Sequence, residues 1–553
     1  MNEALDRLAR DYWEYILEEH PTQALMLGDH RYDGRFEDAS RAAEDRAIGR
    51  SREFAAAAEA IDPGDLTDDE RITREVLIFE ASSRADVAAT RLAEAYVSHT
   101  IGVQAMLPVE LPQYPLTAPE HAAAMPERFH GIAAYFDAAA DRLKDGVAAG
   151  RVPIASTALK TIAMTDELLA ADGDGDPLVK LKAPEGWDGE AAWRAEMAQV
   201  AADVVRPALR RWRDVIADTV VPAGRSDDQP GLCHLPGGEV AYAATLYRYT
   251  TTDKQPQEIH DVGLAQIESL ADEYRTLGAE VLGTSDLDEI FERLRDDPDL
   301  HFEDGPTIVA AAEAAMAKAK AAMGDWFGRL PVADCRVMET ASGPTAFYFR
   351  PAADGSRPGI FFVNTAEPTR WHTFEIESMA YHEGIPGHHL QLAIAGELEG
   401  VPEFRKQAFI AAYGEGWGLY TERLADEMGL YSGPLERIGM LSADSMRAGR
   451  LVVDTGIHAM GWTRQQAIDY FRKNSPMTLT TTENEVDRYI SYPGQATSYM
   501  IGRLEIQRMR RQAEEALGDR FTIKGFHDTV LSSGLVPLGT LDRMVSDWAA
   551  SAS

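Results

Sequence analysis

The sequence predicts a mainly α-helical protein with one small antiparallel β-sheet. Alanine, glutamate and arginine dominate long stretches in which apolar residues recur every three or four positions. Only the region 335–364 shows a two-residue alternation of apolar and polar side chains. Hydrophobic residues make up 45% and charged residues 26% of the chain, the balance of a globular protein. We therefore expect residues 1–553 to form a single large multi-helix unit.

The N-terminal half, residues 1–230, is expected to be helical. Its first segment, 1–21, is an amphipathic helix that carries charges throughout and lacks the apolar stretch of a signal peptide. Turns rich in proline and glycine separate the helices that follow. These helices are expected at 40–62, 68–98, 117–149 and 190–219, and an alanine-rich helix is expected at 308–323.

Residues 335–364 interrupt the helical pattern. Glycine, proline and aspartate mark turns between two or three short segments that alternate in polarity. We expect antiparallel strands at Arg336–Glu339, Ala346–Arg350 and Gly359–Asn364, directly before a cluster of histidines. After this sheet the helical pattern resumes and continues to the C-terminus.

The net charge excludes some classes of partner, and the cysteine content indicates the cellular compartment. The 54 basic and 90 acidic side chains give a net charge of −36, which repels nucleic acid and anionic membrane surfaces. No stretch approaches the roughly 20 apolar residues that a membrane span requires. The two cysteines, Cys233 and Cys335, fit a reducing compartment. We expect a cytoplasmic protein with no nucleic-acid or membrane partner.

The histidine cluster lies in "YHEGIPGHHLQ", residues 381–391. It is similar to the zinc-binding pattern HExxH but is two residues longer. In a regular helix, a ligand six residues after His382 would point about 120° away, and one seven residues after it would lie about 10.5 Å along the axis. Neither position fits one ion with bonds of roughly 2 Å. An unbroken helix therefore cannot form a metal site here.

Three of the four residues between Glu383 and His388 disfavour a regular helix, namely Gly384, Pro386 and Gly387. A break at 384–387 would bring a second histidine back beside His382, and both His388 and His389 are candidates. The alternative is a helix that ends at Glu383 and is followed by ordinary histidines.

A third ligand is expected from the segment 409–428, "FIAAYGEGWGLYTERLADEM". Glu415 lies there among small and aromatic residues, where an unpaired carboxylate is costly to bury. It is predicted to be a ligand; the alternative is a cap or a salt bridge. Glu422, seven residues later on the same face, is a candidate to support the ligands. The metal-site region is expected to span 371–510.

Four motifs in combination resemble the DUF885 family of bacterial proteins of unknown function. They are "YHEGIPGHHLQ", "AYGEGWGLYTE", "DTGIH" and "RYISYPGQATSYMIG", and the resemblance extends from about residue 10 to 550. The family in turn resembles helical zinc peptidases of the gluzincin type, which use HExxH and a downstream glutamate. The resemblance implies Zn²⁺ bound by His382, His388 and Glu415. It also implies that Glu383 is the general base.

The resemblance extends to "TSYMIGRLEIQ", residues 497–507. It implies that Tyr499 stabilises the oxyanion, with Tyr489 and Tyr492 as alternatives. Arg503, one turn later, is a candidate to bind a substrate carboxylate.

His458 is a second candidate for substrate binding. It follows Asp454 by four residues on an expected helix, so the two side chains either line the site or form a structural pair. Arg450 precedes Asp454 by four residues, and this spacing also allows a helix salt bridge.

Three functions fit these residues. The first is a zinc-dependent metallopeptidase that hydrolyses short peptides with a metal-activated water. The second is a metal-dependent hydrolase of other, non-peptide amides, and the third is a non-catalytic metal-binding protein. The intact Glu383 favours catalysis, because a structural metal needs no base.

Overall fold

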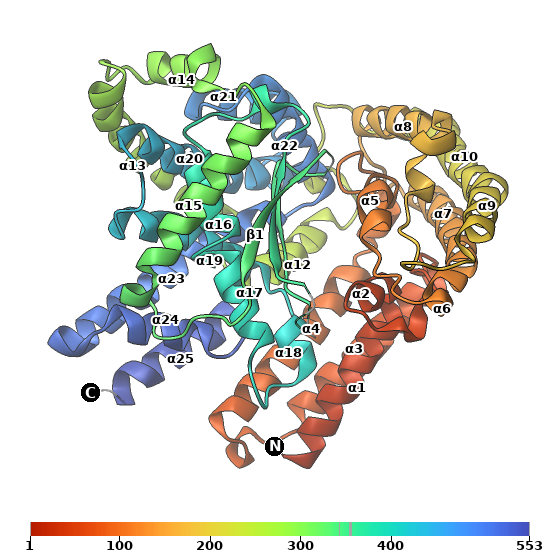
Figure 1. Ribbon diagram of the computed structural model, residues 1–553, viewed down its shortest axis with the longest axis horizontal. Helices are drawn as coiled ribbons and strands as arrows, with labels where there is room; N and C mark the ends of the chain where they lie inside the picture. Colours follow the sequence, from red (N-terminus) through yellow and green to blue (C-terminus); the bar gives the residue numbers. More distant parts are fainter. Residues whose placement is uncertain (1, 342, 353–354, 356, 552–553) are drawn as a thin grey trace.

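The computed structural model describes residues 2–341, 343–352, 355 and 357–551. Most of these residues are helical, as Figure 1 shows. Three strands form one small sheet. The predicted class, mainly α-helical with a small sheet, is confirmed. Among the described residues, no helix is both long and apolar enough to cross a membrane.

The N-terminal helices follow the predicted segments with some changes. Thr67 and Glu70 form a capping box that starts the helix at Asp68, and this helix ends at Ala89, earlier than expected. The segment 117–149 is divided, because Pro126 lies in the first turn of a new helix and has no N–H to continue the previous one. The helices are α1 (Glu3–Glu19), α2 (Pro21–Met26), α3 (Arg41–Glu59), α4 (Asp68–Ala89), α5 (Val103–Glu110), α6 (Pro119–Ala123), α7 (Met125–Ala148), α8 (Ala155–Ala170), α9 (Glu190–Val200), α10 (Arg206–Val215) and α11 (Val221–Ala223).

The C-terminal part contains the sheet and the helices that carry the predicted site. Its elements are α12 (Gly238–Thr250), α13 (Pro256–Val281), α14 (Leu287–Asp296), α15 (Gly305–Trp326), β1 (Cys335–Thr340), β2 (Ala346–Phe349), β3 (Gly359–Asn364), α16 (Ile376–Glu383), α17 (His388–Gly396), α18 (Glu403–Gln407), α19 (Ala411–Glu427), α20 (Pro434–His458), α21 (Arg464–Asn474), α22 (Leu479–Ser491), α23 (Ser498–Leu517), α24 (Ile523–Leu531) and α25 (Leu538–Ser551).

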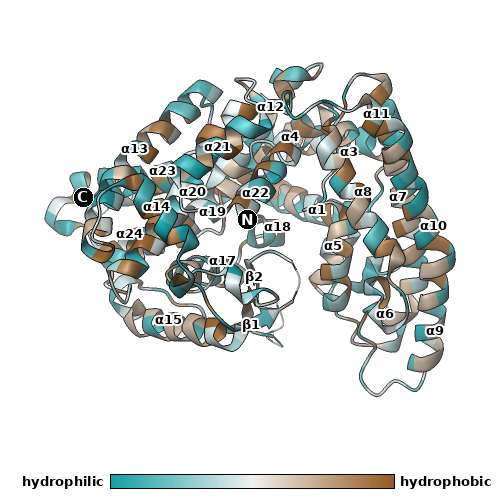
Figure 2. Ribbon diagram, turned by 90° about the horizontal axis from the view of Figure 1, so that it is seen from above, coloured by the Kyte–Doolittle hydropathy of each residue, from teal (hydrophilic) through white to brown (hydrophobic). Residues whose placement is uncertain are grey.

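Two large hydrophobic clusters underlie this arrangement. In Figures 1 and 2, helices α5–α10 group on one side of the molecule, and α13–α15, α23 and α24 group on the other. The first group encloses a cluster of buried residues between Leu25 and Val220. The second cluster includes Phe54 and Val76 of the N-terminal helices together with Tyr381 and Trp417 of the site helices. The first helices therefore pack into the same core as the predicted site.

The strands lie where the sequence predicts them, but one pairing differs. The order is β1–β3–β2, in which β2 pairs with β3 antiparallel and β1 pairs with β3 parallel. The prediction of a wholly antiparallel sheet is therefore wrong for β1 and β3. The central strand β3, "GIFFVN", is the most buried of the three, so it inserts between the others and lies beside β1 in the same direction. Helix α17 packs against β3, which places the sheet beside the histidine cluster.

Candidate metal centre

The helix break predicted at 384–387 is confirmed. Helix α16 ends at Glu383 and α17 begins at His388. The chain between them turns so tightly that a Cβ atom on Gly387 would lie 1.9 Å from the carbonyl oxygen of His382. Glycine is therefore required at this position, because any side chain would collide with the backbone of the preceding helix.

The break brings the three predicted ligands together. His382 Nε2 lies 3.6 Å from Glu415 Oε2, and His388 Nε2 lies 3.3 Å from the same oxygen. One ligand atom from each residue lies within 4.8 Å of the other two, and the two imidazole rings are nearly perpendicular at 86°. Neighbouring donors around a tetrahedral zinc ion are about 3.4 Å apart, since each bond is about 2.1 Å long. The donor set and its spacing thus fit one metal ion.

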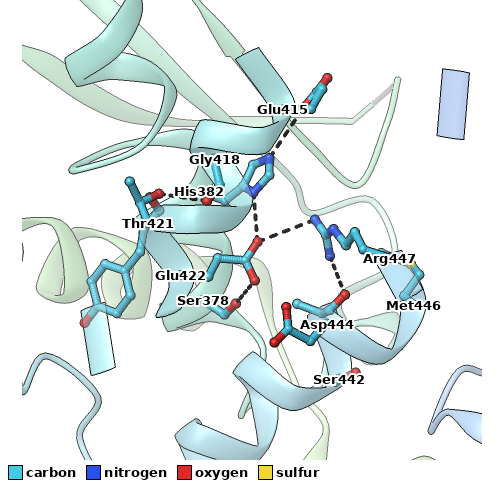
Figure 3. A network of polar contacts seen from close by, with 12 residues as sticks. Ser378, His382, Glu415, Gly418, Thr421, Glu422, Ser442, Asp444, Met446 and Arg447 are labelled. Carbon is cyan, nitrogen blue, oxygen red and sulfur yellow. Dashed lines mark hydrogen bonds and ion pairs between the residues drawn. The ribbon is translucent and has the colours of Figure 1, made fainter. Parts of the chain in front are cut away.

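A buried hydrogen bond orients the first ligand. His382 Nδ1 lies 2.8 Å from Glu422 Oε1, and the hydroxyl of Ser378 donates to the other carboxylate oxygen at 2.8 Å, as Figure 3 shows. Because the Nδ1–H group donates to Glu422, Nε2 is the nitrogen that faces Glu415, and it would be the ligand atom once a metal ion displaces its proton. The supporting role predicted for Glu422 agrees with this contact.

The electrostatics of the cluster favour a cation. Burial would lower the pKa of His382, but hydrogen bonds to Glu415 and Glu422 outweigh burial and raise this pKa to about 9. Burial would raise the pKa of Glu415, but hydrogen bonds from His382 and His388 hold it well below its usual range. Both pKa shifts have one cause: the carboxylates of Glu415 and Glu422 stabilise positive charge on the group that lies between them.

The structure also separates the two candidate histidines of α17. Tyr348 of β2 donates its hydroxyl to His389 Nδ1 at 2.9 Å, and His389 Nε2 donates to the carbonyl of Ala333 at 3.1 Å. Burial lowers the pKa of His389 to about 4. Successive helical residues project about 100° apart, so His389 faces the sheet while His388 faces Glu415. His388 is therefore the second histidine of the cluster.

Glu383 and Tyr499 lie beside this cluster. Glu383 is the last residue of α16 and is half-buried, and within the described part of the chain its carboxylate has no hydrogen-bond or ion-pair partner. The ring of Tyr499 stacks on His382, with centroids 6.3 Å apart and an interplanar angle of 24°. By contrast, the Tyr489 hydroxyl donates to Glu485, and Tyr492 packs edge-on against Tyr249. Of the three tyrosines, Tyr499 is the one that contacts a ligand of the cluster.

Arg503 is held inside the protein. One of its terminal nitrogens pairs with Asp444, the other donates to Gln266 Oε1 at 3.1 Å, and the residue is 4% exposed. Both terminal nitrogens of Arg503 are thus occupied by acceptors of the protein itself, and its role in substrate binding stays a prediction.

His458 is likewise engaged internally. Its Nε2 donates to the carbonyl of Tyr489 at 3.0 Å, and its Nδ1 accepts from the backbone N–H of Leu232 at 3.2 Å. Asp454 accepts from the Tyr242 hydroxyl at 2.6 Å instead of pairing with His458 or Arg450. His458 therefore links α20 to α22 and to the segment that contains Leu232. Its role in substrate binding also stays a prediction.

Two arginines beside the site were not predicted to take part in it. The guanidinium carbons of Arg447 and Arg450 lie 5.8 Å and 4.6 Å from the centre of the Tyr499 ring. The sequence carries a signal for them, since both occur in "MRAGRLVVD", where the neighbouring residues are small or apolar. A charge placed in such a segment is costly to bury unless it has a partner or a function.

A second group of potential ligands, His30, Asp33 and His121, lies in the N-terminal half. The rings of His30 and His121 are stacked face to face, with centroids 3.4 Å apart and planes 6° apart. The nitrogen lone pairs lie in the ring planes, so those of two parallel rings cannot both point at one ion. This group is a poorer match to a metal site than the cluster around Glu415.

Comparison with known proteins places this chain in a family. No curated protein matches the chain. The crystal structure of "the putative lipoprotein from Colwellia psychrerythraea" is similar over 99% of both chains, with 24% identity and a TM-score of 0.90. The structure of "a putative lipoprotein of unknown function from Shewanella oneidensis" is similar over 98% of this chain and 99% of its own chain, with 18% identity and a TM-score of 0.75. At these identities the likeness shows a shared fold. The model of the family described as "Bacterial protein of unknown function (DUF885)" matches residues 21–545, and the chain therefore belongs to the DUF885 family.

Proposed function

We propose that the protein is a zinc-dependent metallopeptidase that hydrolyses short peptides. The observation that carries this proposal is the approach of His382, His388 and Glu415 to one point, with Glu422 behind the first histidine. Two imidazoles and one carboxylate form the donor set of a catalytic zinc, which keeps its fourth position open for water or substrate. A structural zinc is instead enclosed by four protein ligands.

The residues around the cluster supply the other parts of a hydrolytic mechanism. A zinc ion held by the three ligands would polarise the scissile carbonyl and lower the pKa of water. Glu383, adjacent to His382 and free of internal partners among the described residues, accepts the proton of the attacking water and delivers it to the leaving amine. Tyr499 donates a hydrogen bond to the oxyanion of the tetrahedral intermediate.

Several features support a small peptide as the substrate. The edge strands β1 and β2 offer backbone groups to which an extended peptide adds by hydrogen bonds. The net charge of −36 supports the absence of a nucleic-acid or anionic-membrane partner. The free Cys233 and Cys335 support a cytoplasmic location.

A non-peptide amide is the second candidate substrate, because the same ligands, base and oxyanion donor would serve its hydrolysis. The uncommitted carboxylate of Glu383 disfavours a purely structural metal. Digestion of a mixture of short peptides, followed by mass spectrometry, tests the proposal on zinc-loaded and chelator-treated protein. Cleavage should require zinc and return when zinc is restored. A zinc-loaded protein that leaves all peptides intact but hydrolyses simple acyl amides would favour the second candidate.

A further inference from the structure

Two buried arginines lie one aromatic ring away from the metal cluster. Arg447 and Arg450 are three residues apart on α20 and therefore share a face of the helix. Their guanidinium carbons lie 5.8 Å and 4.6 Å from the Tyr499 ring centre, and this ring stacks on His382. The two positive charges are thus next to the proposed reaction site.

Each of these two arginines has a buried N–H group without an acceptor among the described residues. Arg450 donates to Glu485 at 2.8 Å and to the Tyr489 hydroxyl at 2.9 Å, but its buried Nη1 has no hydrogen-bond partner among the described residues. Arg447 lies 3.7 Å from Glu422, and its buried Nε likewise has no partner in the described part of the chain. Burying an unpaired donor of a charged group is costly, so a binding role would explain its retention.

The neighbouring arginines differ in the acceptors around them. Arg503 and Arg423 both bind Asp444, and Arg423 also pairs with Glu273 at 2.7 Å. Their terminal nitrogens are matched by acceptors of the protein itself, although the buried Nε of Arg503 also has no partner among the described residues. Beside Tyr499, in contrast, Glu422 is already engaged by His382, and Glu485 is shared between Arg450 and Arg488. The carboxylates that meet Arg447 and Arg450 are therefore shared with other cationic groups.

We propose that Arg450, assisted by Arg447, binds a carboxylate of the substrate beside the metal centre. A planar guanidinium group recognises a carboxylate through charge-assisted hydrogen bonds. Because a single ring separates these arginines from His382, the carboxylate lies within a few residues of the scissile amide, at about 3.5 Å per extended residue. The substrate class is short peptides with a free C-terminal carboxylate, cut close to that end. This inference rests on the proposed peptidase function.

The first test needs no mutation. A peptide found to be cleaved is compared with the same peptide carrying a C-terminal amide. The wild-type protein should cleave the free acid with a kcat/KM roughly ten- to a hundredfold higher, the range expected for losing hydrogen bonds to a charged group. Equal rates for the two peptides would overturn the proposal.

Variants then assign the preference to the arginines. Arg450→Gln and Arg447→Gln should reduce the ratio of acid to amide cleavage toward one, and Arg450→Lys should keep part of it. A general loss of activity or folding lowers both rates together and leaves the ratio unchanged. Arg437→Gln, on the same helix but paired with Asp426 at the surface, is the matched control and should keep the wild-type ratio. A full preference in both glutamine variants would exclude these arginines.

A binding measurement separates this inference from the proposed function. Calorimetry on chelator-treated protein compares N-acetyl-alanine with N-acetyl-alaninamide, so that a carboxylate cannot bind through zinc. The acid should bind, the amide should not, and Arg450→Gln should abolish binding. If peptides are cleaved but neither probe binds and the acid and amide peptides react equally, the carboxylate site is wrong and the peptidase stands. If the acid binds through Arg450 but no peptide is cleaved, the peptidase is wrong and the carboxylate site stands.

Discussion

The imidazole of His382 and the carboxylate of Glu422 form a buried hydrogen bond of 2.8 Å that joins α16 to α19 (Figure 3). The two side chains are 2% and 1% exposed, so water does not compete for this contact. The bond determines which nitrogen of His382 carries the proton and which one faces Glu415. It therefore couples the packing of two helices to the geometry of the metal cluster.

Replacing Glu422 should weaken metal binding without removing a ligand. We expect Glu422→Ala to lower zinc affinity by about ten- to a hundredfold, the usual effect of losing a carboxylate that supports a histidine ligand. Competition with a chromophoric chelator measures the change. Glu427→Ala, at the exposed end of the same helix, is the control. Unchanged affinity in Glu422→Ala would contradict the role of this bond.

The two histidines of α17 should behave differently on removal. The purified protein should hold about one zinc per chain, and His388→Ala should empty the site, as should His382→Ala. His389→Ala should retain the metal, because that ring is bonded to Tyr348 and to the carbonyl of Ala333. Elemental analysis measures the zinc content of each variant. Loss of zinc in His389→Ala together with retention in His388→Ala would refute the ligand set.

Glu383→Gln separates catalysis from metal binding. The amide has the shape of the carboxylate but cannot accept a proton, so zinc content and folding should be unchanged. Catalysis should fall by roughly a hundred- to ten-thousandfold, the effect typical of removing a general base. Kinetics and elemental analysis on the same sample provide the measurement. A variant that holds zinc and cleaves at the wild-type rate would rule out the proposed mechanism.

Tyr499→Phe removes the proposed oxyanion donor. We expect kcat to fall by roughly a hundred- to a thousandfold while zinc content stays constant. Tyr489→Phe is the matched comparison, because it deletes a hydroxyl that binds Glu485 and Arg450 instead. That variant should mainly lower the melting temperature. If Tyr489→Phe rather than Tyr499→Phe abolished turnover in a folded protein, the oxyanion assignment would move to Tyr489.

Gly418 gives the ring of His382 its space. A Cβ atom on Gly418 would lie 2.7 Å from Cε1 and 2.8 Å from Nε2 of His382, so Gly418→Ala should displace the ring and lower zinc affinity. Gly324→Ala is the control, since its Cβ would meet no atom of the described residues within 4 Å. This control should leave zinc binding unchanged and stabilise α15 by about 0.5–1 kcal/mol. Equal zinc affinity in both variants would contradict the close approach.

Much of the architecture could be predicted from local sequence. The helices follow the recurrence of apolar residues, and the three strands follow the alternation within 335–364. The helix break was also predictable, because Gly384, Pro386 and Gly387 disfavour a regular helix wherever they occur. The position of Glu415 among small and aromatic residues pointed to a ligand on the same grounds of burial.

What these patterns share is that each depends on neighbours within a turn or two of the chain. The sequence by itself therefore determined the helical class, the small sheet and the broken helix that allows a metal cluster. The tertiary structure decided that His388 rather than His389 faces Glu415, because Tyr348, 41 residues away, and Ala333, 56 residues away, hold the other ring. It also decided the parallel pairing of β1 with β3 and the engagement of Arg503 by Asp444. Partners far apart in sequence set these outcomes, and the spacing of residues along one segment carries no information about which distant group it meets.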